Sequence, residues 1–474
     1  MLETVAVPVW ILVAIGLFAA LTVLDRLLLP SVRWFFRRRI NRVLGEVRNR
    51  LDIDIPSFSL TKRQVLIDRL MFDPHVQAAA GEVADETGKP REVILEDVRR
   101  YAREIVPAFN AWVYFRIGFW FARRLSQTFY RVRLGYADDA GLRAIPRNST
   151  PVFVINHRSN MDYVLAAFMA AEKTALSYAV GEWARIWPLQ SLVRMMGGFF
   201  VRRNSGNALY RKVLERYVNM ATDGGVPQAV FPEGGLSRDG GLRPPRLGLL
   251  DYILRGFDQN GGRDVYFIPV GINYDRVVED RSLLLSLDPE RKRRSKVYAT
   301  AVSGRFLFHQ LALALRGRWF RFGYAVVNFG SPVSLKEWLA THDMDLGALS
   351  TEERFAYVEK LAGSLMGEIA GVIPVVPVAL IATVFQQRQT MLLTEGEVQA
   401  AALGMMAQFD RDGALTYIPR ADRDYAIRVG LRMLRLRKIV DEEDGFLKVS
   451  DDNMQLLNYY ANSIAHLMPE PAGP

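Results

Sequence analysis

The sequence contains no cysteine and only five histidines in 474 residues. Without cysteine, the chain has no disulfide framework, no thiol nucleophile, no cysteine-ligated zinc and no protein-held iron–sulfur cluster. The histidines, which stand far apart along the chain, are His75, His157, His309, His342 and His466. They do not form the closely spaced ligand pairs that are typical of metal sites. We therefore expect no metal centre and no thiol catalysis.

Acidic residues are outnumbered by basic ones, 51 against 61, which gives a net charge of +10 and a pI of about 9.7. Most of the basic residues are arginine, whose planar guanidinium suits bidentate binding of phosphate. Nucleic acid, anionic lipid and small phosphorylated substrates are all compatible with this charge, and a high-GC genome would also favour arginine codons. The hydrophobic fraction of 50% excludes a disordered chain.

The segment Thr4–Leu24 carries no charged residue. As a helix it would be about 30 Å long, which is the thickness of a bilayer core. Eight arginines follow between Arg26 and Arg50, and the positive-inside rule then places the rest of the chain in the cytoplasm. A cleaved signal peptide would need a basic start, whereas the first charged residue is Glu3. We expect residues 1–50 to be a single-pass anchor in the inner (cytoplasmic) membrane, with a basic segment that binds anionic phospholipid.

Residues 51–140 are expected to be mostly helical. Ser59 or Thr61 is a candidate cap for a first helix, and Pro90 is a candidate start for a second one.

The stretch Trp112–Phe129 carries seven aromatic residues with interleaved arginines. This mixture is typical of nucleic-acid surfaces, of core helices whose arginines reach solvent and of helices that lie in a membrane interface. Because an anchor is predicted nearby, we expect an interfacial helix, with a core helix as the alternative and nucleic acid not a partner.

Residues 141–340 alternate between short apolar runs and helical segments. The predicted strands are Pro151–Ile155, Leu176–Val180, Phe199–Val201, Gln228–Phe231, Val265–Val270, Val297–Val302 and Tyr324–Phe329. This alternation predicts an α/β domain with a mixed, mainly parallel sheet flanked by helices. Residues 341–474 are expected to form a helical C-terminal region. There, Pro374 and Pro377 interrupt an uncharged run, which favours a buried or interfacial helix pair over a membrane span.

One polar segment follows the first predicted strand of this domain: Asn156, His157, Arg158, Ser159 and then Asp162. Ligands of α/β sheets gather at the carboxyl ends of strands, so His157 is placed where a general base would act. Asp162 is close enough in sequence to accept a hydrogen bond from the other ring nitrogen. On its own, this spacing is more often that of a loop histidine without function followed by a helix-capping aspartate.

Three further segments end predicted strands. Gly198–Arg203 closes with the paired arginines Arg202 and Arg203, which suit a phosphate. Phe231–Gly240 is a glycine-rich loop that includes Glu233, Gly234, Gly235, Ser237 and Arg238. Phe267–Asp275 returns to the same edge of the sheet. Each segment alone is also compatible with an ordinary turn or core strand.

Together and in this order, the four segments, called the first to fourth motifs below, resemble the glycerolipid acyltransferase family, and most of all its bacterial glycerol-3-phosphate acyltransferase branch. The resemblance implies acyl transfer from acyl-CoA or acyl carrier protein to the sn-1 hydroxyl of glycerol 3-phosphate, with no cofactor beyond the acyl donor. The product would be lysophosphatidate, made in the first step of phospholipid synthesis. His157 would be the general base and Asp162 would orient it, with direct transfer and no acyl-enzyme.

The resemblance also implies a set of substrate-binding residues: Arg158, Ser159, Arg202, Arg203, Glu233, Gly234, Gly235, Ser237 and Arg238. Among them, the arginines at 202, 203 and 238 would neutralise the acceptor phosphate, and Glu233 would position glycerol hydroxyls. Ser159 would shape the turn. One departure concerns Leu236, where the family commonly has arginine. It leaves open other acceptors, dihydroxyacetone phosphate or lysophosphatidate. A non-catalytic membrane-anchored lipid-binding protein is a separate alternative, against which the retention of His157, Asp162, Glu233 and Arg238 speaks. A serine hydrolase is a weaker alternative, because no Gly-x-Ser-x-Gly segment occurs.

Overall fold

The computed structural model describes residues 56–468, apart from 171–174, 182–184, 186–188, 203–204, 288–321, 347–349 and 389–390. The predicted anchor, its basic segment, Arg203 and the strand expected at Val297–Val302 lie outside the described residues. Within the described part, no helix is both long enough and apolar enough to cross a membrane.

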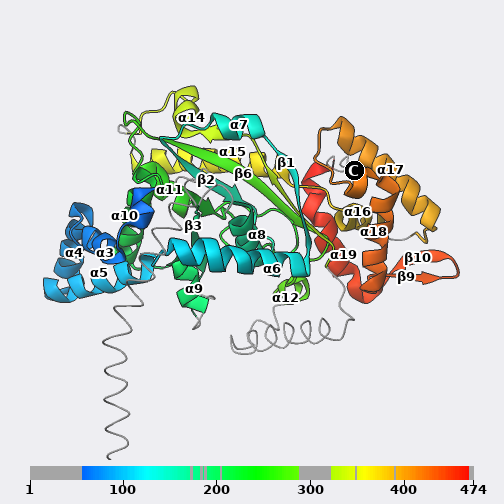
Figure 1. Ribbon diagram of the computed structural model, residues 1–474, viewed down its shortest axis with the longest axis horizontal. Helices are drawn as coiled ribbons and strands as arrows, with labels where there is room; N and C mark the ends of the chain where they lie inside the picture. The colour runs from blue at the N-terminus through cyan, green and yellow to red at the C-terminus, as the bar shows by residue number, and fades with distance from the viewer. Residues whose placement is uncertain are drawn as a thin grey trace, which may run out of the picture.

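A mixed sheet with the strand order β1-β7-β6-β2-β5-β3-β4 forms the centre of the molecule (Figure 1). Its strands are β1 (Arg131–Ala137), β2 (Ser149–Ile155), β3 (Ser177–Gly181), β4 (Gly198–Val201), β5 (Gln228–Val230), β6 (Asp264–Tyr274) and β7 (Tyr324–Phe329), with β8 (Val333–Ser334) beside β6. The pairs from β6 through β2, β5 and β3 to β4 are parallel, whereas β7 and β8 run antiparallel to β6. The predicted mainly parallel sheet is confirmed.

The two central strands are apolar on both faces because helices cover both sides of the sheet. Along β2, Val152 and Val154 pack into one core cluster, which they share with the N-terminal helices. The alternate residue Ile155 packs into a second cluster, which contains the C-terminal helices. The period-2 alternation of a strand therefore divides the core in two.

The N-terminal helices are α2 (Ser57–Leu60), α3 (Arg63–Met71), α4 (Pro74–Thr87) and α5 (Arg91–Ile105). Pro90 is the residue before α5, as expected. The predicted caps of the first helix are wrong: α3 begins at Arg63 after Lys62, and the Thr61 hydroxyl donates instead to the Ser57 carbonyl at 3.1 Å. A π-helix (Val113–Gly118) and α6 (Phe119–Phe129) then lead into the sheet.

The helices that follow the sheet strands are α7 (Asp139–Ala144), α8 (Met161–Ala170), α9 (Leu189–Met195), α10 (Ala208–Asp223), α11 (Gly248–Arg255), α12 (Asp280–Leu285), α14 (Leu335–Thr341) and α15 (Thr351–Val372). The chain breaks after α15, and α16 (Pro377–Gln387) begins with a proline at its first position. Residues 377–385 of α16 are all buried, so the interrupted apolar run is a buried helix, one of the two readings expected of it.

The C-terminal region continues with α17 (Glu395–Arg411), α18 (Arg423–Leu436), α19 (Met454–Ala461) and a 3₁₀ helix (Asn462–Leu467), at the opposite end of the sheet from the N-terminal helices (Figure 1). It also holds an antiparallel hairpin of β9 (Val440–Glu443) and β10 (Phe446–Val449), which the sequence analysis missed. Asp444 and Gly445 join these strands with positive φ angles of 50° and 81°. An Asp-Gly pair of this kind favours a two-residue hairpin turn.

Candidate active site

The chain leaves β2 at Ile155 and passes through Asn156 to His157 before α8 begins. Both polar atoms of the Asn156 side chain bind the backbone of Ile272 in β6, with distances of 2.9 Å to the carbonyl and 2.7 Å from the N–H. This double contact holds the end of β2 against β6. His157 is therefore fixed at the carboxyl end of a central strand, as the sequence predicted.

Asp162 lies in the first turn of α8 and accepts four hydrogen bonds. Its Oδ2 is 2.9 Å from His157 Nδ1 and accepts the backbone N–H groups of Arg158 at 2.7 Å and Ser159 at 2.9 Å. Its Oδ1 accepts the hydroxyl of Tyr274, from β6, at 2.5 Å. Both His157 and Asp162 are buried, with 2% and 0% of their surface exposed. Tyr274 lies in the fourth motif, but the sequence did not predict this contact.

The hydrogen bond between His157 and Asp162 decides which ring nitrogen of the histidine is free. A carboxylate only accepts, so Nδ1 carries the proton and Nε2 carries a lone pair. Nε2 makes no hydrogen bond to any residue that the structure describes. The ring is held between Phe231, whose centroid is 4.3 Å away, and Tyr163, at 5.3 Å. The site thus presents an oriented base.

Glu233 braces the loop that carries His157. One carboxyl oxygen accepts the His157 N–H at 2.7 Å and the other accepts the Arg243 N–H at 3.1 Å. Burial raises the pKa of Glu233 to about 7, although these two N–H groups favour the ionised form. These partners are the protein's own backbone, and the contact with glycerol hydroxyls stays a prediction.

The rest of the glycine-rich loop is folded onto His157. The Ser237 N–H donates to the His157 carbonyl at 2.8 Å, and the Ser237 hydroxyl donates to the Gly241 carbonyl at 2.6 Å. Gly234 has a φ of +65°, and a Cβ there would lie 2.6 Å from Arg246 Cγ. Gly235 is buried and Arg238 is exposed. Ser237 is therefore engaged in shaping the turn.

Ser159 is held by a residue that the sequence analysis did not single out. Its hydroxyl donates to Glu279 Oε2 at 2.7 Å, and Asn160 contacts the other oxygen of Glu279 through its N–H at 3.2 Å and its side chain at 3.1 Å. Burial raises the pKa of Glu279. These bonds tie the first motif to the start of α12.

Arg202 lies at the end of β4, three strand positions from β2, a separation of about 14 Å at the usual strand spacing. It forms a bidentate ion pair with Glu104 of α5, with distances of 2.8 Å and 2.6 Å, and Arg185 binds the same carboxylate. Burial alone would raise the pKa of Glu104, but the hydrogen bonds from Arg202 and Arg185 outweigh it and lower that pKa. The structure does not bring Arg202 into contact with the residues around His157, and Glu104 was missed by the sequence analysis.

Within the described residues, no group of three or more side chains is arranged to hold a metal ion.

Comparisons with known proteins find similarity to acyltransferases. Residues 138–273 match the family described as Acyltransferase, and residues 308–473 match the one described as Glycerol-3-phosphate acyltransferase C-terminal region. The chain is 26% identical over 447 residues to the glycerol-3-phosphate acyltransferase of Xylella fastidiosa strain M23 and 27% identical over 456 residues to that of Pseudomonas paraeruginosa. Each comparison covers 92% of this chain, and 50% and 52% of those proteins. The chain therefore spans about half the length of the curated relatives it matches.

The chain also matches the solved structure of the 1-acyl-sn-glycerophosphate acyltransferase from Thermotoga maritima. The match has 19% sequence identity and a TM-score of 0.30, and it covers 64% of this chain and 95% of the Thermotoga protein.

Proposed function

We propose that the chain transfers a fatty acyl group from a thioester to the sn-1 hydroxyl of glycerol 3-phosphate. Its matches to the Acyltransferase and Glycerol-3-phosphate acyltransferase C-terminal region families, and to curated glycerol-3-phosphate acyltransferases, support this proposal. The donor is acyl-CoA or acyl carrier protein, and the product is lysophosphatidate. The observation that carries this proposal is the buried His157–Asp162 pair, whose geometry leaves Nε2 as an oriented base.

In the proposed reaction, His157 Nε2 takes the hydroxyl proton while the hydroxyl oxygen attacks the thioester carbonyl carbon. Asp162 stabilises the imidazolium that forms, because its carboxylate faces Nδ1–H. The tetrahedral intermediate then collapses, the carbon–sulfur bond breaks, and the imidazolium returns the proton to the departing thiolate. The acyl group moves directly to the acceptor, so no covalent enzyme intermediate is formed.

Replacing the base tests this mechanism. In an assay with radiolabelled glycerol 3-phosphate and acyl-CoA or acyl carrier protein, we expect His157→Ala to lower the rate at least about 10³-fold, because removal of a general base that acts with its oriented partner has effects of this size. The matched control is His75→Ala, on the exposed first turn of α4, which should keep the wild-type rate. Equal rates for wild type and His157→Ala would exclude the mechanism. Dihydroxyacetone phosphate and lysophosphatidate in competition would show whether either is the preferred acceptor.

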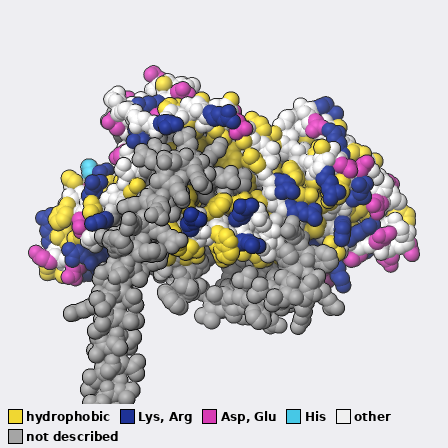
Figure 2. Space-filling model, in the orientation of Figure 1, with side chains coloured by type: hydrophobic (Ala, Val, Ile, Leu, Met, Phe, Trp, Pro, Cys, Tyr) yellow, Lys and Arg dark blue, Asp and Glu magenta, His cyan; other side chains and the backbone are white. Residues whose placement is uncertain are grey.

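We also propose that the protein works at the inner membrane, with the anchor expected at Thr4–Leu24 and α6 as an interfacial helix. Ala122, Ser126 and Phe129 of α6 are buried against the protein, whereas Trp120 and Phe121 are 59% and 46% exposed. In Figure 2, hydrophobic and basic side chains stand side by side where α6 crosses the face. An amphipathic surface of this composition suits anionic lipid headgroups.

Vesicle binding tests the role of α6. Trp120→Ser with Phe121→Ser should weaken binding of the protein to anionic vesicles, because less apolar surface then enters the interface. The paired change Glu82→Ser and Glu86→Ser, on exposed positions of α4, is the control. Both pairs of changes are made in a chain that lacks residues 1–50, because the anchor expected at Thr4–Leu24 would hold the full chain on vesicles. Unchanged sedimentation of the shortened chain would exclude α6 from the membrane surface.

A further inference from the structure

Arg158 is a buried cation whose guanidinium is incompletely paired. Its side chain is 2% exposed, and its Nε and Nη2 have no hydrogen-bond partner among the residues that the structure describes. The two carboxylates beside it are engaged elsewhere, Asp162 with His157 and the loop, Glu233 with backbone N–H groups. A buried charge without hydrogen bonds is strongly unfavourable. The incompletely paired guanidinium is therefore suited to bind an anion.

Nε and Nη2 form one edge of the guanidinium fork. Arg202 shows what this edge does in the same protein, because its Nε and Nη2 each bind one oxygen of the Glu104 carboxylate. Two oxygens of a phosphate fit the edge in the same bidentate way. In Arg158 this edge is open, whereas in Arg202 it is occupied.

The neighbour of Arg158 comes from the C-terminal region. The ring of Tyr459, in α19, has its centroid 5.2 Å from the guanidinium carbon. The Tyr459 hydroxyl is buried and also has no hydrogen-bond partner by distance and angle among the described residues. Burial raises the pKa of Tyr459, although the charge of Arg158 and a polar contact between its guanidinium and the phenol oppose this rise, so the phenol keeps its proton and is a donor.

The segment that carries Tyr459 is fixed against the motif loops. The Tyr459 carbonyl lies against Gly240, where a Cβ would be only 1.8 Å from its oxygen. The Asn462 side chain donates to the Asp239 carbonyl at 3.0 Å, and the Asn273 side chain donates to the Ser463 hydroxyl at 3.2 Å. The C-terminal segment 459–463 thus touches the first, third and fourth motifs.

We propose that Arg158 and the hydroxyl of Tyr459 bind the phosphate of the acceptor, so that the C-terminal region completes the acceptor site. This inference rests on the proposed function. Arg158 directly follows His157, and Glu233, which accepts the His157 N–H at 2.7 Å, also interacts with the charge of Arg158, so a phosphate held here keeps a three-carbon acceptor near the base. A phosphate site at Arg158 explains why the third motif can have Leu236 in place of arginine. It also explains why Arg202 can be paired with Glu104 and still leave the acceptor phosphate with a binding residue.

Steady-state kinetics of the full chain in lipid vesicles test the assignment. Arg158→Gln should raise the KM for glycerol 3-phosphate at least about tenfold, because it removes charge-assisted hydrogen bonds, and leave the KM for the acyl donor unchanged. Tyr459→Phe keeps the ring and should raise the same KM by about threefold, because one neutral donor is lost. The matched control is Arg211→Gln, on the exposed face of α10, which should leave both constants unchanged. Glycerol, which lacks the phosphate, should be acylated equally by wild type and Arg158→Gln.

Thermal unfolding with inorganic phosphate tests binding without catalysis. Phosphate should raise the Tm of the wild type but not that of Arg158→Gln. If Arg158→Gln does not fold, Arg158→Lys keeps the charge without the fork and should give an intermediate KM.

The possible failures are distinguishable. Wild type that acylates no acceptor contradicts the proposed function, while a phosphate shift that depends on Arg158 still supports the subsite. Active wild type together with an unaltered KM and an unaltered phosphate shift in Arg158→Gln overturns the subsite alone. Phosphate-specific loss in Arg238→Gln without loss in Arg158→Gln also overturns it.

Discussion

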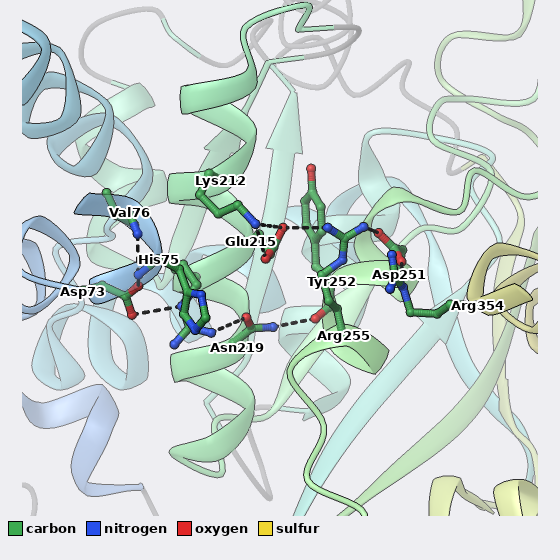
Figure 3. Close-up of polar contacts among 11 residues, drawn as sticks. Asp73, His75, Val76, Lys212, Glu215, Asn219, Asp251, Tyr252, Arg255 and Arg354 are labelled. Carbon is green, nitrogen blue, oxygen red and sulfur yellow. Dashed lines mark hydrogen bonds and ion pairs between the residues drawn. The ribbon is translucent and has the colours of Figure 1, made fainter. Parts of the chain in front are cut away.

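Two buried polar networks of this protein treat their carboxylates differently. Figure 3 shows the one between the helices, here called the helix network, which includes Asp73, Lys212, Glu215, Asn219, Asp251, Arg255 and Arg354. Arg216, which pairs with Asp73 at 2.9 Å, also belongs to it. In it, Glu215 is paired with Lys212 at 2.9 Å and with Arg255 at 3.2 Å, and Asp251 with Arg255 at 2.7 Å and Arg354 at 3.2 Å. Each of these two carboxylates is neutralised by two cations.

Around His157, the carboxylates are held by neutral donors instead. Asp162 accepts from an imidazole, two backbone N–H groups and a phenol, and Glu233 accepts from two backbone N–H groups. Neutral donors fix a carboxylate in place without cancelling its charge. The charge of Asp162 therefore stays available to stabilise an imidazolium, which a carboxylate paired with arginine would do poorly. The helix network holds helices together, whereas the carboxylate of Asp162 can stabilise the positive charge that forms on His157.

Asp162→Asn should have the largest effect among the substitutions that test this difference between the two networks. The amide oxygen can still accept from Nδ1–H, but the amide carries no charge, so the imidazolium that forms loses its counter-charge. We expect kcat to fall by about 10³-fold or more, with circular dichroism unchanged. A variant that keeps a tenth of the wild-type kcat would show that Asp162 is not the partner of the base.

Glu215→Ala tests the helix network, where we expect a loss of stability and no loss of activity. It leaves Lys212 and Arg255 without one partner in a partly buried position, so we expect the free energy of unfolding in urea to fall by about 2 kcal/mol. The KM and kcat at saturating lipid should not change. As a control, Asp410→Ala breaks an exposed pair with Arg423 and should cost about 0.5 kcal/mol or less. A large loss of kcat without loss of stability would contradict this division of roles.

Tyr274→Phe sharpens the comparison within the site, because it removes one of the neutral donors to Asp162. We expect kcat to fall by about tenfold, since a hydrogen bond to a charged group is lost, while the KM for both substrates is retained. Tyr130→Phe is the matched control: its ring packs 5.2 Å from that of Tyr274, but its hydroxyl donates to the Arg276 carbonyl. An equal kcat in wild type and Tyr274→Phe would contradict the role of this phenol.

The smallest expected effect is on pH dependence. Burial raises the pKa of Glu233 and of Asp275 to about 7, whereas both groups titrate near 4 in an unfolded chain. Between about pH 4 and pH 7 the folded protein therefore holds protons that the unfolded chain has lost, and the free energy of unfolding falls as the pH rises. Glu233→Gln should reduce this fall in urea unfolding between pH 5 and pH 7.5. An identical fall in both proteins would mean that Glu233 does not titrate in this range.

The separation of the predicted residues along the chain explains which parts of the site could be read from the sequence. His157 and Asp162 are five residues apart, so a strand end and the following helix turn bring them together whatever the rest of the fold does. Arg202 was predicted to share a phosphate site with them, but the strand order places β4 three positions away and Glu104 pairs with it. A phosphate site assembled from several strands depends on strand order, which alternation of strands and helices does not specify.

The sequence by itself determined the α/β alternation, the mainly parallel sheet, the breaks at prolines and the positions of the motif loops, because these follow from local periodicity and from turn chemistry. Only the tertiary structure decided the partners of the motif residues. Tyr274, Glu279 and Tyr459 reach the first motif across more than 100 residues of chain. Contacts over such separations follow from the register of β2 on β6 and from the docking of the C-terminal helices, which the residues near His157 do not encode.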